Sequence, residues 1–230
     1  INMQSDKDIT NYILQYLEIA RKESIPVFVL DYADKKSLVD KIYNKALSFN
    51  FIPFIADSYL LNNIPDYPPE PIQVNQKDIT RLKEVNNFLY LINPEKFSSK
   101  KELINKLQNT NYDLLVIDLF FNDKFFTKQE INSLKKKANG GKRLVLSYLN
   151  IGEAEKYRYY WKESWNKKFP DWIKNINTGW PDSYIVKYWH NEWKNIIYKK
   201  KDSYLNKIIQ ANFDGVIIDR VDIFSYFEIK

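Results

Sequence analysis

The stretch that decides the fold opens at residue 142 with KRLVLSYLNIGEAEKYRYYW and closes at residue 222 with NFDGVIIDRVD. Its apolar runs at 144–148 and 216–218 are short and adjoin glycines or charged residues, which favours buried β-strands. Carboxylates stand at or just past the end of each run: Glu153, Glu155, Asp219 and Asp222. A strand that ends in a carboxylate indicates a site at its C-terminal edge, although aspartates also cap loops and helix starts.

The rest of the chain continues the same alternation of strands and helices. Further strands are expected at 27–30, 51–56, 88–92 and 114–117, and helices at 7–22, 38–46, 99–107, 127–134 and 191–210. Because no hairpin signal is found, the sheet is expected to be parallel. Four of the strands end in aspartate, at Asp31, Asp57, Asp118 and Asp219. The sequence therefore predicts an α/β fold, a TIM-type (β/α) barrel with six of eight strands identified. A doubly wound sheet is disfavoured because no glycine-rich phosphate loop occurs.

Two segments of the N-terminal part carry more specific expectations. The first helix is predicted to be amphipathic, with an inward face of Ile9, Ile13, Tyr16, Leu17 and Ala20. The segment 64–83 is rich in proline and lacks an apolar period, which indicates a linker. The length of 230 residues and the 44% hydrophobic content fit one domain, 1–230.

Composition excludes several kinds of site. There is no cysteine and one histidine, His190, so thiolate metal sites, histidine-rich zinc sites and nucleophilic triads are ruled out. His190 is expected to be structural, at a helix start. No apolar stretch reaches the roughly 20 residues that span a bilayer, and no signal peptide begins the chain, although a leader removed before Ile1 fits this. The lysines behind the net charge of +6 are interpreted as solvated helix faces.

Carboxylates and aromatic rings remain as the groups that carry chemistry. Two carboxylates that flank a glycosidic bond suffice for its hydrolysis, whereas a cluster of them binds Mg²⁺ or Ca²⁺. All six tryptophans fall within 142–222, and aromatic faces give sugar rings an apolar platform. Trp161, Trp165 and Trp193 are placed on predicted helices and assigned to packing. Trp180 and Trp189 are assigned to ligand binding.

Three motifs resemble the endo-α-1,4-polygalactosaminidase family of glycoside hydrolases, whose fold is a (β/α) barrel. They are YLNIGEAEKYRYYW (148–161), WPDSYIVKYWHNEWKNII (180–197) and FDGVIIDRVD (213–222). Residues 87–230 resemble the N-terminal part of the family's domain. Residues 7–63, with PVFVLDYAD and FIPFIADSYLL, resemble its C-terminal part, so the order looks circularly permuted. The family has strands beyond the one that ends at Asp219, which leaves a second chain or a missing segment to complete the barrel.

The resemblance also implies roles for individual residues. Asp219 matches a catalytic aspartate, and its glutamate partner lies on a later strand without a counterpart here, so Glu153 and Glu155 are the candidate substitutes. An arginine such as Arg158 that pairs with one of them would depress its pKa and make it a poor general acid. The further substrate-binding candidates are Asp31, Tyr32, Asp118, Tyr148, Asn150, Arg158, Trp180, Trp189 and Asp222.

Two functions follow from these expectations, neither with a cofactor or a resident metal. The first is a secreted or cell-surface, endo-acting hydrolase of an α-1,4-linked galactosamine polysaccharide. The second is a non-catalytic carbohydrate-binding barrel, which differs from the first in lacking a second carboxylate about 5 to 10 Å from Asp219. Nucleic-acid binding ranks below both, because the acids among the aromatic residues would repel phosphate. A cationic polymer requires that the cleft itself be acidic, given the net charge of +6.

Overall fold

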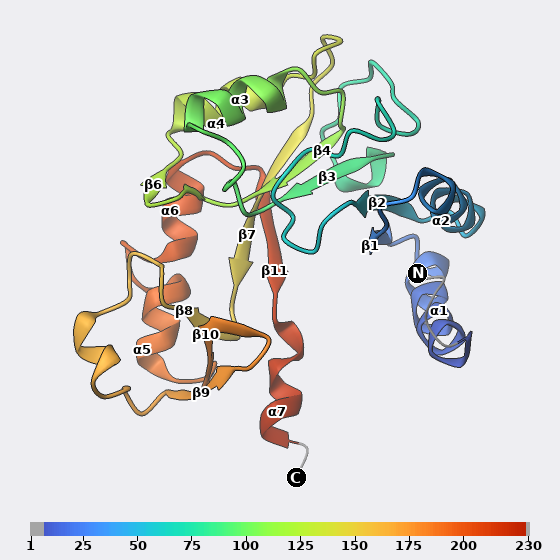
Figure 1. Cartoon of the computed structure of the whole chain (residues 1–230). Coiled ribbons are helices and arrows are strands. Elements are labelled where there is room, and N and C mark those ends of the chain that lie inside the picture. The colour runs from blue at the N-terminus through green and yellow to red at the C-terminus, as the bar shows by residue number, and fades with distance from the viewer. Residues whose placement is uncertain (1–6, 229–230) are drawn as a thin grey trace. The chain divides into compact units, whose positions relative to one another are not determined.

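The computed structural model describes residues 7–228 and divides the chain into two compact units (Figure 1). The first unit comprises Ile1–Asp118 and Glu130–Leu146, and the second comprises Leu119–Gln129 and Ser147–Lys230. None of the helices within residues 7–228 has the length and apolar character that crossing a lipid bilayer requires.

The first unit begins with two helices and a parallel pair of strands. These are α1 (Lys7–Lys22), β1 (Phe28–Tyr32), α2 (Lys36–Ser48) and β2 (Ile52–Ala56). The predicted inward face of α1 is correct for Leu17 and Ala20, which pack against a core that contains Val29 and Phe51. It is wrong for Ile13 and Tyr16, which are exposed. The helix meets this core along a narrow stripe through Leu14, Leu17 and Ala20, so the predicted face was too wide. The side chain of Ile9 lies outside the described residues.

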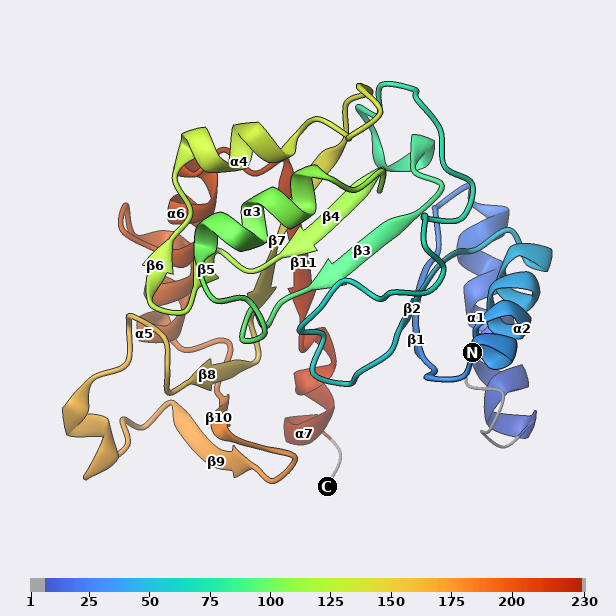
Figure 2. The same ribbon diagram turned by 45° about the horizontal axis from the view of Figure 1, so that its top comes forward.

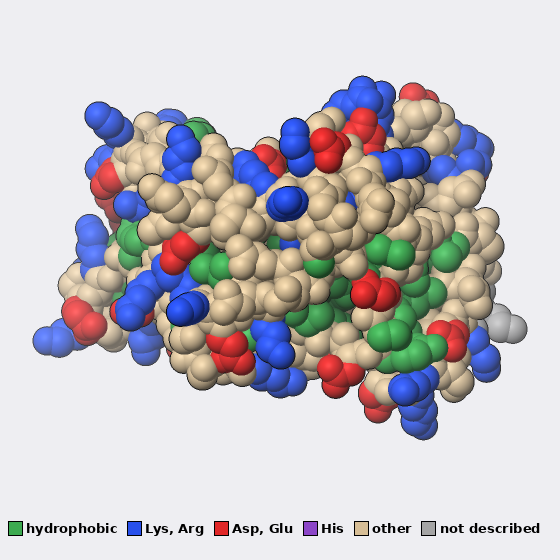
Figure 3. Space-filling model, turned by 90° about the horizontal axis from the view of Figure 1, so that it is seen from above, with side chains coloured by type: hydrophobic (Ala, Val, Ile, Leu, Met, Phe, Trp, Pro, Cys, Tyr) green, Lys and Arg blue, Asp and Glu red, His purple; other side chains and the backbone are tan. Residues whose placement is uncertain are grey.

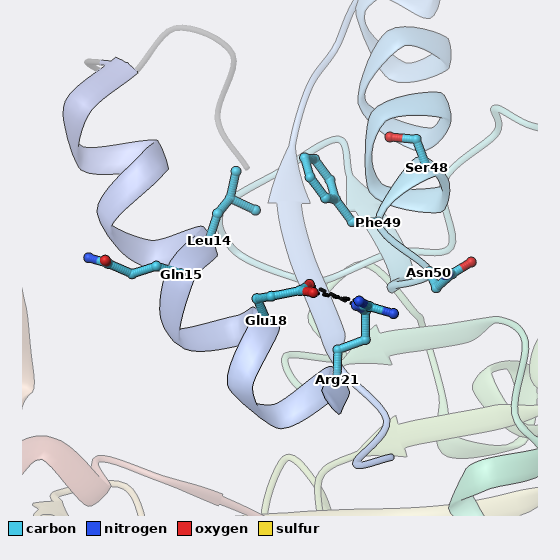
Figure 4. A pocket seen from close by; sticks show the side chains of 7 residues that line it. All are labelled: Leu14, Gln15, Glu18, Arg21, Ser48, Phe49 and Asn50. Carbon is cyan, nitrogen blue, oxygen red and sulfur yellow. Dashed lines mark hydrogen bonds and ion pairs between the residues drawn. The ribbon is translucent and has the colours of Figure 1, made fainter. Parts of the chain in front are cut away.

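A shallow cleft of about 520 Å³ lies between α1 and the residues that follow α2 (Figure 4). Its lining is Leu14, Gln15, Glu18, Arg21, Ser48, Phe49 and Asn50. Arg21 Nε donates to Glu18 Oε2 at 2.7 Å, so the acid in this cleft is already neutralised by a neighbour on its own helix.

The remainder of the first unit forms a second parallel pair and its connections. The elements are η1 (Leu82–Glu84), β3 (Phe88–Leu91), α3 (Lys100–Gln108), β4 (Leu114–Ile117), α4 (Lys128–Leu134) and the start of β7 (Leu144–Asn150). Strands β3 and β4 run parallel and lie side by side (Figure 2). All four residues of β4 are buried, as expected for a parallel strand covered on both faces. The helix expected at 99–107 is confirmed as α3, and Ser99 caps its start, because Ser99 Oγ accepts from the amide of Glu102.

An ion pair is buried at the start of β4. Lys137 Nζ lies 2.9 Å from Asp113 Oδ1, and both side chains are 0% exposed. Asn75, from the proline-rich segment, donates from Nδ2 to both oxygens of Asp113, at 3.2 and 3.0 Å. The amide of Asn86 donates to Oδ2 at 3.0 Å. The segment before β3 is therefore tied to the start of β4 by a fully hydrogen-bonded charge.

The second unit carries the remaining elements. They are β5 (Phe120–Phe121), β6 (Lys124–Phe125), β8 (Glu153–Glu155), η2 (Glu163–Asn166), β9 (Ile173–Asn177), β10 (Trp180–Val186), α5 (Asn191–Lys194), η3 (Asn195–Lys199), α6 (Tyr204–Gln210), β11 (Gly215–Asp219), η4 (Val221–Ile223) and α7 (Phe224–Glu228). The end of β7 lies beside β11 in this unit (Figure 1). His190 is confirmed at a helix start, because its Nδ1 accepts from the amide of Glu192.

Three predictions about this unit are wrong. The single helix expected at 191–210 is broken into α5, the π-helix η3 and α6, because Ser203 caps a fresh start for α6 through the amide of Asn206. The expected absence of hairpins is contradicted by the antiparallel pairs β5–β6 and β9–β10. Much of β9 and the start of β10 face solvent, so these strands lack the apolar alternation that signals a hairpin. The placement of Trp161 on a helix is also wrong, because this residue lies in an irregular segment before η2.

The six predicted parallel strands are all present, as β1, β2, β3, β4, β7 and β11. The fold is thus α/β with parallel strands. Residues 7–228 do not form a closed barrel, because β1 and β11 each have one paired neighbour strand.

Candidate functional site

Asp219 ends β11 with both carboxylate oxygens accepting hydrogen bonds. Tyr148, on β7, donates its hydroxyl to Oδ2 at 2.6 Å. The backbone amide of Arg220 donates to Oδ1 at 2.8 Å. These two donors fix the orientation of the Asp219 carboxyl group.

The turn after β7 brings a second carboxylate to this place. Asn150 Oδ1 accepts from the amides of Gly152 and Glu153, at 3.1 and 3.0 Å, which fixes the turn. A Cβ at Gly152 would lie 2.6 Å from the carbonyl oxygen of Arg220, so this close approach of two backbone segments requires glycine. The amide of Ile151 also donates to the carbonyl of Asp219, at 3.2 Å. The strand β8 therefore begins directly against the end of β11.

Glu153, the first residue of β8, is 2% exposed and uses one of its oxygens. Its Oε1 lies 2.8 Å from Arg220 Nε and accepts from Asn177 Nδ2 at 2.9 Å. Oε2 has no hydrogen-bond or ion-pair partner among the described residues. Burial raises the pKa of Glu153 by more than Arg220 and Asn177 lower it, and the nearby charge of Glu155 raises it further. Glu153 is thus a buried carboxyl whose pKa lies above its ordinary value and whose Oε2 has no partner among the described residues.

Glu155 is bound differently, although it stands on the same strand. Arg158 Nε donates to its Oε2 at 2.6 Å, and the hydroxyl of Tyr157 donates to its Oε1 at 2.7 Å. The guanidinium of Arg158 in turn lies over the rings of Tyr157 and Phe120, at 4.9 and 5.3 Å from their centroids. Both carboxylate oxygens of Glu155 therefore accept hydrogen bonds. The expected pairing of Arg158 with one of the two glutamates is with Glu155, and Arg158 does not pair with Glu153.

Of the six tryptophans, three are buried, two are exposed, and Trp161 is half-buried; Trp172 is the third buried one, beside the two named next. Trp165 and Trp193 are buried as expected, and Trp193 Nε1 donates to the carbonyl of Ile151 at 2.8 Å, which supports the turn behind Glu153. Trp180 is 53% exposed at the start of β10, and Trp189 is 45% exposed. Trp189 packs edge-on against Phe227, with their ring centroids 4.7 Å apart. These two exposed indoles are the ones available to a ligand.

The remaining candidates are spread over both units. Asp222 is exposed, and its Oδ2 lies 3.4 Å from Arg220 Nη1. In the first unit, Asp31 is buried and its Oδ1 accepts from the amide of Tyr32 at 2.9 Å. Asp118, also buried, follows β4. The residues that the structure brings together in the second unit are Tyr148, Asn150, Glu153 and Asp219.

Two residues of this group were not predicted. Arg220 stands in the quoted FDGVIIDRVD motif, so its position beside two aspartates was a visible signal. Asn177 gave no signal, because its contact with Glu153 depends on the pairing of β10 with both β8 and β9. Within residues 7–228, no three acidic or histidine side chains converge as a metal-binding group.

Comparisons with known proteins identify relatives of the chain. A protein of Methanocaldococcus jannaschii described as uncharacterised is 38% identical over 185 residues, which are 77% of this chain and 49% of that protein. Uncharacterised proteins of Thermotoga maritima and Deinococcus radiodurans are 48% and 31% identical over 36% and 53% of this chain. These two matches span 24% and 37% of the respective relatives, so the chain covers at most about half of any of the three.

A family model accounts for most of the chain. The model described as glycoside-hydrolase family GH114 matches residues 72–229, which include both parallel strands β7 and β11 and every residue of the Asp219 and Glu153 group. This is the polygalactosaminidase-like family that the three motifs resemble. The chain therefore belongs to glycoside-hydrolase family GH114.

Proposed function

We propose that this protein hydrolyses glycosidic bonds with Asp219 and Glu153 as its two carboxylates. The observation that carries the proposal is that Arg220 contacts both carboxyl groups, while the environments of the two groups differ. Asp219 accepts hydrogen bonds on both oxygens, whereas Glu153 is buried with Oε2 unengaged and its pKa raised. Carboxylates whose environments push their protonation apart are the basis of acid-base assignment in glycosidases.

The proposed chemistry assigns one role to each carboxylate. Glu153, protonated on Oε2, gives its proton to the leaving glycosidic oxygen as the bond from that oxygen to the anomeric carbon breaks. Asp219 either attacks the anomeric carbon or takes a proton from the water that attacks it. The Glu153 carboxylate left behind is stabilised by the guanidinium of Arg220 and regains a proton before the next cycle. Tyr148 holds Asp219 in place throughout.

The proposed substrate is an α-1,4-linked galactosamine-type polysaccharide. The family membership and the resemblance of the three motifs support this class. Trp180 and Trp189 offer exposed apolar faces for sugar rings. Lys and Arg side chains are interspersed with acids over the face drawn in Figure 3, so a cationic sugar does not meet a continuous basic surface there. Asp219 and the exposed Asp222 supply local negative charge.

A second candidate function, carbohydrate binding without hydrolysis, is favoured by one observation. Glu153 is 2% exposed, and a general acid must reach its substrate. If Glu153 remains covered when sugar binds, the exposed tryptophans would still bind the polymer while Asp219 lacks an acid partner.

The fold proposed with this function is a (β/α) barrel completed by strands from a second chain or another segment. The single paired neighbour of β11 supports it, because parallel sheets are seldom left open at an apolar edge. Light scattering of the active preparation distinguishes a second chain from one longer polypeptide.

The experiment is an incubation of the protein with α-1,4-linked galactosamine oligomers, followed by mass spectrometry of the products. Hydrolysis is expected, with a loss of roughly 100-fold or more in Asp219→Asn. Asp171→Asn is the control, since Asp171 is exposed in the same unit and away from the described contacts of the carboxylates. Oligomer binding without cleavage would select the second function, and neither binding nor cleavage would reject both for this substrate.

A further inference from the structure

Arg220 contacts both proposed carboxylates through different parts of the residue. Its backbone amide donates to Asp219 Oδ1 at 2.8 Å, and its Nε lies 2.8 Å from Glu153 Oε1. Its Nη1 lies 3.4 Å from Asp222 Oδ2. Within residues 7–228, no other residue contacts both carboxyl groups through its side chain or amide.

The backbone of Arg220 adopts a conformation that residues with a side chain rarely hold. Its φ of 59° and ψ of 35° are left-handed, which disfavours any residue with a Cβ. Two contacts hold it there: the close approach of Gly152 to its carbonyl, and a hydrogen bond from the amide of Ile223 to that carbonyl at 3.3 Å. Such strain persists where surrounding contacts over-determine it, and it is concentrated at functional sites.

The left-handed turn explains how one residue serves two carboxylates. It directs the amide back to the preceding Asp219, while the guanidinium crosses to Glu153 at the start of β8. The sequence keeps arginine here although glycine would relieve the strain.

We infer that Arg220 is the positioning residue of the site: it occupies Oε1 of Glu153 so that the proton is carried on Oε2, and it ties the protonation of Glu153 to the orientation of Asp219. This inference rests on the proposed function, because it concerns the same two carboxylates.

The charges around Glu153 come from three elements. Arg220 approaches from the turn after β11, Asn177 from β9, and Glu155 from β8 itself. Arg220 is the cation of this set, and it lowers the pKa of Glu153 against the larger effect of burial. Its side chain is 31% exposed and shared with Asp222, so its charge is partly screened. The net result of these contributions is a pKa of Glu153 above its ordinary value.

The test is a titration of Glu153 by NMR of protein labelled with ¹³C at the glutamate side-chain carboxyls, with Glu153→Gln used to assign its signal. In Arg220→Gly, the Glu153 midpoint is expected to rise by about one pH unit or more. In Arg220→Lys, which keeps the charge, it should stay nearer the wild-type value. Because glycine relieves the left-handed strain, Arg220→Gly is expected to melt at or above the wild-type temperature.

The matched control is Lys174→Gln, which removes one exposed positive charge from β9. It is expected to leave the Glu153 midpoint in place. An unchanged midpoint in Arg220→Gly, or an equal rise in the Lys174→Gln control, would overturn the inference. The titration needs no turnover, so a wild-type protein that hydrolyses nothing but shows the Arg220 effect would reject the proposed function and leave the coupling standing.

Discussion

Two buried carboxylates of this protein meet opposite conditions. Asp113, in the first unit, is 0% exposed and accepts from Lys137, Asn75 and the amide of Asn86, so both of its oxygens are satisfied. Glu153, in the second unit, is 2% exposed, and its contacts fall on a single oxygen. Its cation, Arg220, is partly exposed, whereas Lys137 is wholly covered.

This difference in hydrogen-bond partners distinguishes a carboxylate that stabilises the fold from one that is available for acid-base chemistry. A buried charge with a full set of partners stabilises one arrangement, and losing a partner is costly. A buried carboxyl group with one oxygen free of hydrogen bonds can carry a proton on that oxygen without losing a contact. Acid-base residues have this property. Burial alone therefore does not identify a catalytic acid, but the number of its satisfied oxygens does discriminate.

The largest expected effect concerns the saturated pair. Lys137→Met should lower the free energy of unfolding by about 3 to 5 kcal/mol, because it leaves Asp113 buried without its cation. Urea denaturation measures this. Lys142→Met is the control, since its pair with Asp78 is exposed on both sides and removal should cost at most about 1 kcal/mol. An equal loss of unfolding free energy in the two variants would contradict the structural role assigned to the pair of Lys137 and Asp113.

The next effect concerns the hydroxyl on Asp219. Tyr148→Phe should lower kcat/KM on the galactosamine oligomers roughly thirty-fold, because a hydrogen bond to a charged group is worth about 2 kcal/mol. Steady-state kinetics measures this loss, and melting temperatures of the variant and the wild type show whether the fold is retained.

The comparison for Tyr148 is Tyr157→Phe, which removes the matching hydroxyl from Glu155. A smaller loss is expected there, because Glu155 is assigned to structure. A larger loss in Tyr157→Phe would move the proposed chemistry from Glu153 to Glu155.

The smallest effect is a pH dependence of stability. The pKa of Glu153 is raised in the folded state, so as pH rises above the usual glutamate pKa the unfolded state loses its proton first and the wild type loses stability. Glu153→Gln lacks this loss. Its free energy of unfolding relative to wild type should therefore improve from about pH 4 to about pH 7 in urea titrations. A change in the opposite direction would mean that Arg220 outweighs burial.

Apolar runs made much of the fold predictable. Five of the six parallel strands are hydrophobic segments with buried residues, and burial on both faces leaves that mark on a sequence. The burial expected for the run at 216–218 is wrong, because β11 has one paired neighbour strand, contains no buried residue and leaves Ile218 49% exposed. The hairpin of β9 and β10 was missed because its exposed residues, such as Lys174 and Asp182, carry no such mark. Its position follows instead from pairing with β8, a contact distant in sequence.

The site was predictable to the level of residue type and strand end. Asp219 and Glu153 follow apolar runs, so their proximity could be expected from strand ends that share an edge. The division of labour between Glu153 and Glu155 could not, because it depends on which glutamate Arg158 reaches after the turn at 156–157. The left-handed conformation of Arg220 could not be predicted either, since the close approach of Gly152 that holds it comes from the turn between β7 and β8, far away in the sequence.

The measurement that tests the central claim most directly compares two substrates in two variants. Glu153→Gln and Asp219→Asn are assayed on the galactosamine polymer and on an aryl galactosaminide whose leaving group needs no proton. The account predicts that Glu153→Gln loses polymer cleavage but keeps bond cleavage of the aryl substrate, while Asp219→Asn loses both. Normal polymer cleavage by Glu153→Gln, or equal loss on both substrates, would contradict the assignment of Glu153 as the acid.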